Sequence, residues 1–188
     1  DKVYLFDKDS NSLLWSYETG NNVNAVSISS DGKRIVVGSS DKKVYLFDKE
    51  SSTPLWTYSA GDNVRTVDIS ANGEYIVAGS YDDKVYLFDK DSSTPVWSYS
   101  TGGNIWAVSI TEDGEYIAVS SMDDKFYLFN QGSSTPLWVT DAYAPSRANA
   151  ITSDGKYLAS GTSNYDDVDD ANLWVFKNSL ADRPSIIP

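Results

Sequence analysis

The chain has 188 residues, with 15 Lys and Arg against 27 Asp and Glu, so its formal net charge is −12. It contains no His and no Cys, which excludes an imidazole general base, a thiolate nucleophile, a disulfide framework and a Cys/His zinc site. The acidic balance does not suit a phosphate backbone, and no segment approaches the run of about 18 apolar residues that spans a bilayer. We therefore expect neither a nucleic-acid partner nor membrane insertion.

A tandem repeat with a period of 41 residues organises the sequence. The phrase Val-Tyr-Leu-Phe-Asp begins at Val3, Val44 and Val85, and a variant of it begins at Phe126. A last, altered copy begins at Leu173, after a short insertion. A repeat of this length is typical of solenoids and propellers. We expect the repeats to occupy residues 1–178 and residues 179–188 to form a C-terminal tail.

Each unit contains four short apolar runs of strand length, separated by turn residues. In the third unit they are Val85–Phe88, Val96–Tyr99, Ile105–Ile110 and Tyr116–Val119. Glycine at the tight hairpins and Ser-Ser-Thr-Pro at the longer ones supply the turn chemistry, and no segment has sustained helical periodicity. Four antiparallel strands in about 40 residues indicate one β-propeller blade.

We name the strands of a blade A to D, so that 105–110 is strand A, 116–119 is B, 85–88 is C and 96–99 is D. The chain then begins at strand C, runs through three full units and ends at strand C. This predicts an all-β fold of 17 strands, or about four blades, which is a partial ring or half of an eight-bladed ring.

The repeat resembles two known families. The segment from Val64 through Asn72-Gly73 to Phe88-Asp89 resembles a WD-repeat, with Phe-Asp in place of the closing Trp-Asp and without the Gly-His pair. The phrase Leu87-x-Asp89-x-x-Ser92-Ser93-x-x-x-Trp97 is similar to the tryptophan-docking motif of quinoprotein-like propellers. That resemblance implies a structural role between neighbouring blades for the four equivalent tryptophans, Trp15, Trp56, Trp97 and Trp138.

Comparison of the repeats with one another predicts a binding face. The A–B and C–D loops are similar in all units, whereas variation gathers in the D–A and B–C connections, which share the opposite face of a propeller. At the start of strand A the equivalent residues are Asn24, Arg65, Trp106 and Arg147. In the B–C turn they are Ser40, Tyr81, Met122 and Ser163. Arg, Trp, Tyr and Met are enriched at interfaces, although neutral drift on an exposed rim would give the same pattern.

The insertion at 164–172 is the most acidic stretch and includes a cluster of carboxylates at Asp166, Asp167, Asp169 and Asp170. Such a cluster can hold calcium weakly, but the spacing matches no calcium loop. We favour a solvated loop over a metal site. We also expect no cofactor, because the docking tryptophan is a packing device and no vicinal Cys pair covers a quinone ring.

Two classes of function follow. The first is a non-enzymatic interaction or structural module that binds a protein or a glycan on the D–A and B–C face. The alternative is an enzyme, either a quinoprotein-like oxidoreductase or a fragment of a hydrolase that uses two carboxylates. The acid of the variable face that we consider for this alternative is Asp141.

The cysteine-free, acidic composition and the quinoprotein-like motif favour an extracytoplasmic location. An open arc of blades exposes apolar faces and strand edges. We therefore expect either a piece of a longer propeller or a homodimer that closes an eight-bladed ring.

Overall fold

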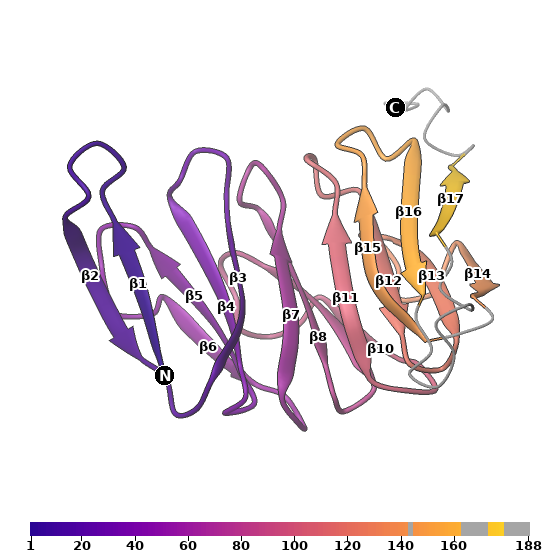
Figure 1. Ribbon diagram of the computed structural model, residues 1–188, viewed down its shortest axis with the longest axis horizontal. Helices are drawn as coiled ribbons and strands as arrows, with labels where there is room; N and C mark the ends of the chain where they lie inside the picture. Colours follow the sequence, from indigo (N-terminus) through magenta and orange to yellow (C-terminus); the bar gives the residue numbers. More distant parts are fainter. Residues whose placement is uncertain (143–144, 163–172, 179–188) are drawn as a thin grey trace.

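The computed structural model describes residues 1–142, 145–162 and 173–178, and this part of the chain consists of β-strands and their connections (Figure 1). Seventeen strands form five antiparallel sheets that follow one another along the molecule in chain order. The all-β class and the blade pattern predicted by the repeat are therefore confirmed. No helix in the described residues is long and apolar enough to cross a membrane.

The sheets at the two ends are smaller than the three between them. The first sheet pairs β1 (Lys2–Phe6) with β2 (Leu13–Glu18), and the last contains β15 (Ser146–Ile151), β16 (Tyr157–Thr162) and β17 (Leu173–Lys177). The first complete blade contains β3 (Val23–Ile28), β4 (Arg34–Ser39), β5 (Lys43–Asp48) and β6 (Trp56–Ser59). The second contains β7 (Val64–Ile69), β8 (Tyr75–Ser80), β9 (Lys84–Asp89) and β10 (Trp97–Ser100). The third contains β11 (Ile105–Ile110), β12 (Tyr116–Ser121), β13 (Lys125–Asn130) and β14 (Trp138–Asp141).

Each complete blade has its strands in the order A, B, C, D, so the end sheets correspond to strands C-D and A-B-C. Strand D of the third unit begins at Trp97, one residue later than the sequence predicts. The reason is that Val96 closes the C–D loop by donating its N–H to the carbonyl of Leu87 at 2.7 Å, and its side chain stays 52% exposed.

The core lies between blades, where the two faces of strand C meet different neighbours. Val85 and Leu87 of β9 join the cluster that includes the third blade, whereas Tyr86 and Phe88 join the cluster of the first complete blade. All four side chains are buried. Alternate residues of a strand point to opposite faces, so the phrase Val-Tyr-Leu-Phe gives each of the first two complete blades one aliphatic and one aromatic face, whereas Phe126 makes the second face of the third blade mixed. The aliphatic face of one blade packs against the aromatic face of the next.

Strand-D tryptophans add a hydrogen bond to this packing. In three of the four, the indole Nε1–H donates to a main-chain carbonyl 34 residues later, in the next blade, at 2.7–2.8 Å. The pairs are Trp15 with Lys49, Trp56 with Lys90 and Trp97 with Gln131. Each ring also lies 5.3–5.4 Å from a phenylalanine of that blade. Trp138 makes the corresponding ring contact with Phe176, at 5.6 Å.

In each of the three complete blades, a carboxylate of the B–C turn ties that turn to the preceding D–A turn. Asp82 accepts hydrogen bonds from the N–H of Gly61 at 2.7 Å, the N–H of Lys84 at 3.1 Å and the hydroxyl of Tyr86 at 2.5 Å. A side chain at position 61 would place its Cβ 2.9 Å from an Asp82 carboxylate oxygen, so any residue other than glycine would displace the carboxylate that binds this turn. Burial, and then the bond to Asp82, raise the pKa of the Tyr86 hydroxyl, which keeps it a donor.

The same network recurs in the neighbouring blades. Asp41 bonds to Gly20, Lys43 and Tyr45, and Asp123 bonds to Gly102, Lys125 and Tyr127. A tyrosine–aspartate pair is therefore part of the link between the B–C turn and the preceding D–A turn in all three complete blades.

Removing one donor from this network should destabilise the fold less than removing its acceptor. We expect Tyr86→Phe to lower the free energy of unfolding by about 1–2 kcal/mol, because one hydrogen bond to a charged group is lost. Asp82→Ala should cost about 3 kcal/mol, because three donors lose their acceptor. Urea denaturation measures both, with Tyr157→Phe on an exposed ring as the control. A Tyr86→Phe variant as stable as the control would contradict the role given to the network.

Apolar side chains remain exposed at both ends of the stack. At the first end, Val26 and Ile28 of β3 are 59% and 52% exposed beside a hollow of about 220 Å³ that β1 also lines. At the other end, Leu173 and Val175 of β17 are 75% and 65% exposed. These ends lie far apart in Figure 1 and do not pair with each other within the described residues.

We expect the 188-residue chain on its own to self-associate, because contiguous apolar surface at a sheet edge favours contact between copies. Light scattering over a concentration series should give a mass above the 20.7 kDa of one chain. Replacing Val26 and Ile28 together by Asp should shift the mass toward the monomer. A wild-type chain that stays monomeric at every concentration would contradict this expectation.

Candidate interaction site

The four variable residues at the start of strand A all lie at β-bulges. Pairing between strands A and B shifts register once in each blade, between the residues on either side of the variable one. The residues skipped by the ladder are Asn24, Arg65, Trp106 and Arg147. A bulge leaves its extra residue unpaired and re-aims the side chain. The ladder therefore places little constraint on this residue type, which explains why the repeats differ here.

Three of these residues converge on one another, and we call them the Arg–Trp–Arg stack: Arg65, Trp106 and Arg147. The guanidinium carbons of Arg65 and Arg147 each lie 5.1 Å from the centre of the Trp106 ring. Arg65 belongs to β7 and Arg147 to β15, so the two cations reach the indole of β11 from the blades on either side of it. At this distance the electron-rich ring face attracts a cation.

Tyr81 completes the cluster from the B–C turn. Its ring lies 6.1 Å from that of Trp106, tilted by 41°. Its N–H donates to the carbonyl of Asn63 at 2.9 Å, which holds the B–C turn against the D–A turn. The structure thus brings together one Tyr, one Trp and two Arg that the sequence places on the same face, and all four are half-buried.

The cluster contains hydrogen-bond donors without acceptors. The indole Nε1 of Trp106 is buried and has no hydrogen-bond partner among the described residues. The Arg65 guanidinium likewise makes no ion pair or hydrogen bond within the described part of the chain, and its contact is the one with Trp106. Both groups can only donate.

Two other predicted residues are placed differently. The side-chain amide of Asn24 donates to the hydroxyl of Ser40 and to the carbonyl of Val64, both at 2.9 Å, so it ties two blades together. Met122 packs against the D–A turn, where a Cβ on Gly103 would lie 3.3 Å from its own Cβ. Ser163 lies outside the described residues.

The calcium candidates Asp166, Asp167, Asp169 and Asp170 also lie outside the described residues. Within residues 1–142, 145–162 and 173–178, no group of three or more His, Cys, Asp or Glu side chains could hold a metal ion.

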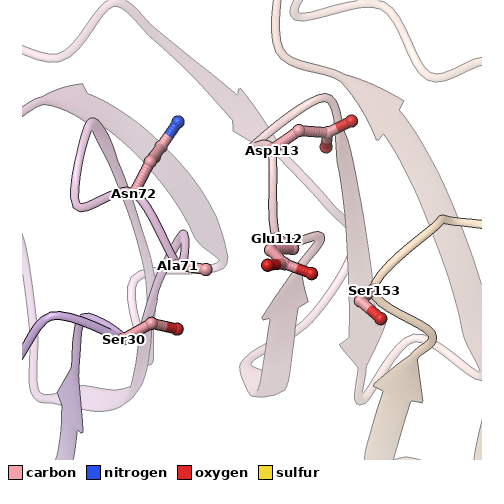
Figure 2. Close-up of a pocket in the computed structure, with 6 residues that line it drawn as sticks. All are labelled: Ser30, Ala71, Asn72, Glu112, Asp113 and Ser153. Atoms are coloured by element: carbon pink, nitrogen blue, oxygen red, sulfur yellow. The ribbon is translucent and has the colours of Figure 1, made fainter.

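The opposite face has a shallow hollow among the A–B turns (Figure 2). It has a volume of about 510 Å³ and is lined by Ser30, Ala71, Asn72, Glu112, Asp113 and Ser153. Main-chain hydrogen bonds of 3.0–3.3 Å join its floor from blade to blade, from Ser30 to Ala71, from Ala71 to Glu112 and from Glu112 to Ser153. Figure 2 shows the Glu112 carboxylate between the turns of Ala71 and Ser153, with Asp113 pointing away from it.

Asp68 is a carboxylate that the sequence analysis missed. Its oxygens accept hydrogen bonds from the Ser27 hydroxyl at 2.8 Å, its neighbour Ile69 N–H at 2.9 Å and the Ile110 N–H at 3.1 Å. It therefore joins β3, β7 and β11, and it lines a hollow of about 390 Å³ together with Glu112. The repeat comparison could have found it, because the equivalent residues in other units are Ser27, Ser109 and Ala150.

One protein family, described as outer membrane protein assembly factor BamB, has a sequence model that matches residues 1–166. The match covers the first sheet, all three complete blades, and strands β15 and β16. No curated protein matches the chain.

Asp68 should make stability depend on pH with the opposite sign to Asp31. Burial raises the pKa of Asp68, so its contribution to stability is full below its unfolded pKa of 3.8 and is lost as pH rises through the folded value. Hydrogen bonds from the Lys33 N–H and then from Ser29 lower the pKa of Asp31 to about 2, so its contribution is present above 3.8 and lost as pH falls.

Urea denaturation of Asp68→Asn and Asp31→Asn across acidic to neutral pH measures this difference. The unfolding free energy of the wild type relative to Asp68→Asn should fall as pH rises, and relative to Asp31→Asn it should rise. A pH-independent difference for Asp68→Asn would mean that its carboxyl is not desolvated.

Proposed function

The chain belongs to the family of the outer membrane protein assembly factor BamB, and on this premise we propose that it is a non-enzymatic β-propeller interaction module. Its partner is a protein, bound on the face formed by the D–A and B–C turns. The convergence of Arg65, Trp106, Arg147 and Tyr81 is the observation that carries this proposal. Trp, Tyr and Arg dominate the binding energy of protein interfaces when they are clustered and partly desolvated.

The turns that present this cluster are held in place before any partner arrives. The Asp82 carboxylate fixes a B–C turn to a D–A turn, and the Tyr81 N–H adds a main-chain hydrogen bond between them. Side chains on such turns lose little conformational freedom on binding, which favours affinity. The fixed turns therefore support a binding surface on this face over neutral variation of an exposed rim.

Several observations favour binding over catalysis. Hydrolysis by two carboxylates needs a pair about 5–10 Å apart, with room for substrate and water. Asp68 already accepts three hydrogen bonds that join blades, and Asp141 is an exposed residue at the end of β14. The quinoprotein-like tryptophans are engaged by the next blade, consistent with packing.

We propose an extracytoplasmic location. The family's name refers to assembly of outer membrane proteins, and a chain without cysteine is suited to an oxidising compartment because it cannot form unwanted disulfides.

Peptide display tests the proposed face. We expect a random peptide library panned against the wild-type chain to yield binders whose affinity falls about tenfold or more in Trp106→Ala, because a clustered Trp is removed. The matched control is Lys33→Ala, an exposed residue of an A–B turn, which should leave affinity unchanged. Thermal unfolding of Trp106→Ala within about 4 °C of the wild type would establish that the variant is folded.

Binders that tolerate Trp106→Ala would overturn the assignment of this face. A glycan array run in parallel tests the other partner class. Glycan binding that depends on Trp106, without any such peptide, would replace the protein partner by a glycan.

A further inference from the structure

We infer that the Arg–Trp–Arg stack binds a carboxylate of an acidic side chain on the partner protein. This inference rests on the proposed function, since it names the chemistry that the D–A and B–C face recognises. It comes from an imbalance of donors and acceptors in the cluster.

Two hydrogen-bond donors of the cluster have no acceptor within the described residues. The Trp106 indole N–H is buried without an acceptor, and a buried polar group without a partner costs free energy that a ligand can recover. The Arg65 guanidinium beside it has no acceptor among the described residues. The half-buried Arg65 is open to a ligand, whereas the covered indole nitrogen is reached only if the Trp106 side chain turns. A ligand of Arg65 must offer acceptor oxygens, and it gains most from them if it is negatively charged.

Among the described residues, Arg65 lies without an ion-pair partner on a protein that is acidic overall. The chain has 27 acidic residues for 15 basic ones, so an arginine without a carboxylate partner is not explained by a shortage of acids. Two acids of the nearby turns, Asp82 and Asp123, bond to turn amides and tyrosine hydroxyls, and no carboxylate among the described residues forms an ion pair with Arg65. Arg65 is therefore a local positive site on an acidic protein.

Among groups with acceptor oxygens, a carboxylate matches the Arg65 guanidinium best. A guanidinium held over an indole ring keeps its in-plane N–H donors available, and these match the two oxygens of a carboxylate. A polyanion such as nucleic acid would be repelled by the net charge of −12, whereas a single acidic side chain within a protein segment meets mainly the local positive site.

Nuclear magnetic resonance of the indole N–H groups tests this directly in the full chain. The Trp106 signal is assigned by its loss in Trp106→Phe. The probe is a blocked pentapeptide with one central glutamate, compared with its glutamine twin and with inorganic phosphate. We expect the glutamate peptide to shift the Trp106 signal saturably, with the glutamine peptide about tenfold weaker or more because the charge-assisted hydrogen bonds are lost.

Arg65→Gln should weaken the glutamate peptide about tenfold while Lys33→Ala leaves it unchanged, because only the first removes a charged donor at the site. Equal binding of the two peptides, tighter binding of phosphate, or an unmoved Trp106 signal at about 10 mM glutamate peptide would overturn the inference.

The resonance experiment and the display experiment can fail independently of each other. Binders that need Trp106 but carry no acid and tolerate Arg65→Gln would leave the interaction face in place and remove the carboxylate. A Trp106 signal that responds to glutamate, without any binder that depends on Trp106, would retain the carboxylate site and remove the proposed protein partner.

Discussion

The packing of an aliphatic blade face against an aromatic blade face is the interaction on which the rest of the structure depends. It arises from four consecutive residues of strand C, such as Val85 to Phe88, whose side chains alternate between the two neighbours. The first two complete blades repeat the phrase, whereas the third has Phe126 in place of the valine and stacks it on Phe176 of the last sheet. The tryptophans of strand D then fix the spacing by a hydrogen bond 34 residues along the chain. The stacking of blades therefore sets the positions of the turns at the blade rims.

At the blade rims, a hydrogen-bond network that recurs from blade to blade lies beside a position whose residue varies. In each blade an aspartate such as Asp82 binds the preceding D–A turn and a strand-C tyrosine, so the backbone of the two turns is the same in successive units. The bulged residue beside this network is free of the ladder and differs from blade to blade. A rigid frame that carries free positions is a general route to a binding surface on a repeat protein. Here it places Arg65 and Arg147 around Trp106.

Most of the fold could be predicted from the sequence because its determinants are local and repeated. The 41-residue period, the alternation in strand C and the glycines of the hairpins suffice to define the strands and their order. The variable positions could also be predicted, since Arg65, Trp106 and Arg147 occupy one position in successive units. Their contact could not, because it depends on a register shift between two strands and on how closely blades stack. Asp68 differs visibly from Ser27, Ser109 and Ala150 at the same repeat position, but its role could not be predicted, because the Ile110 N–H that it binds is a backbone group of another blade.

A crystal structure of the chain with a display-selected peptide tests most directly whether the D–A and B–C face binds a protein. We expect the peptide to lie across the D–A and B–C turns, with an acidic side chain within hydrogen-bond distance of the Arg65 guanidinium and against the Trp106 ring. A peptide seated instead in the hollow of the A–B turns, against Glu112, would contradict it and move the functional surface to the opposite face.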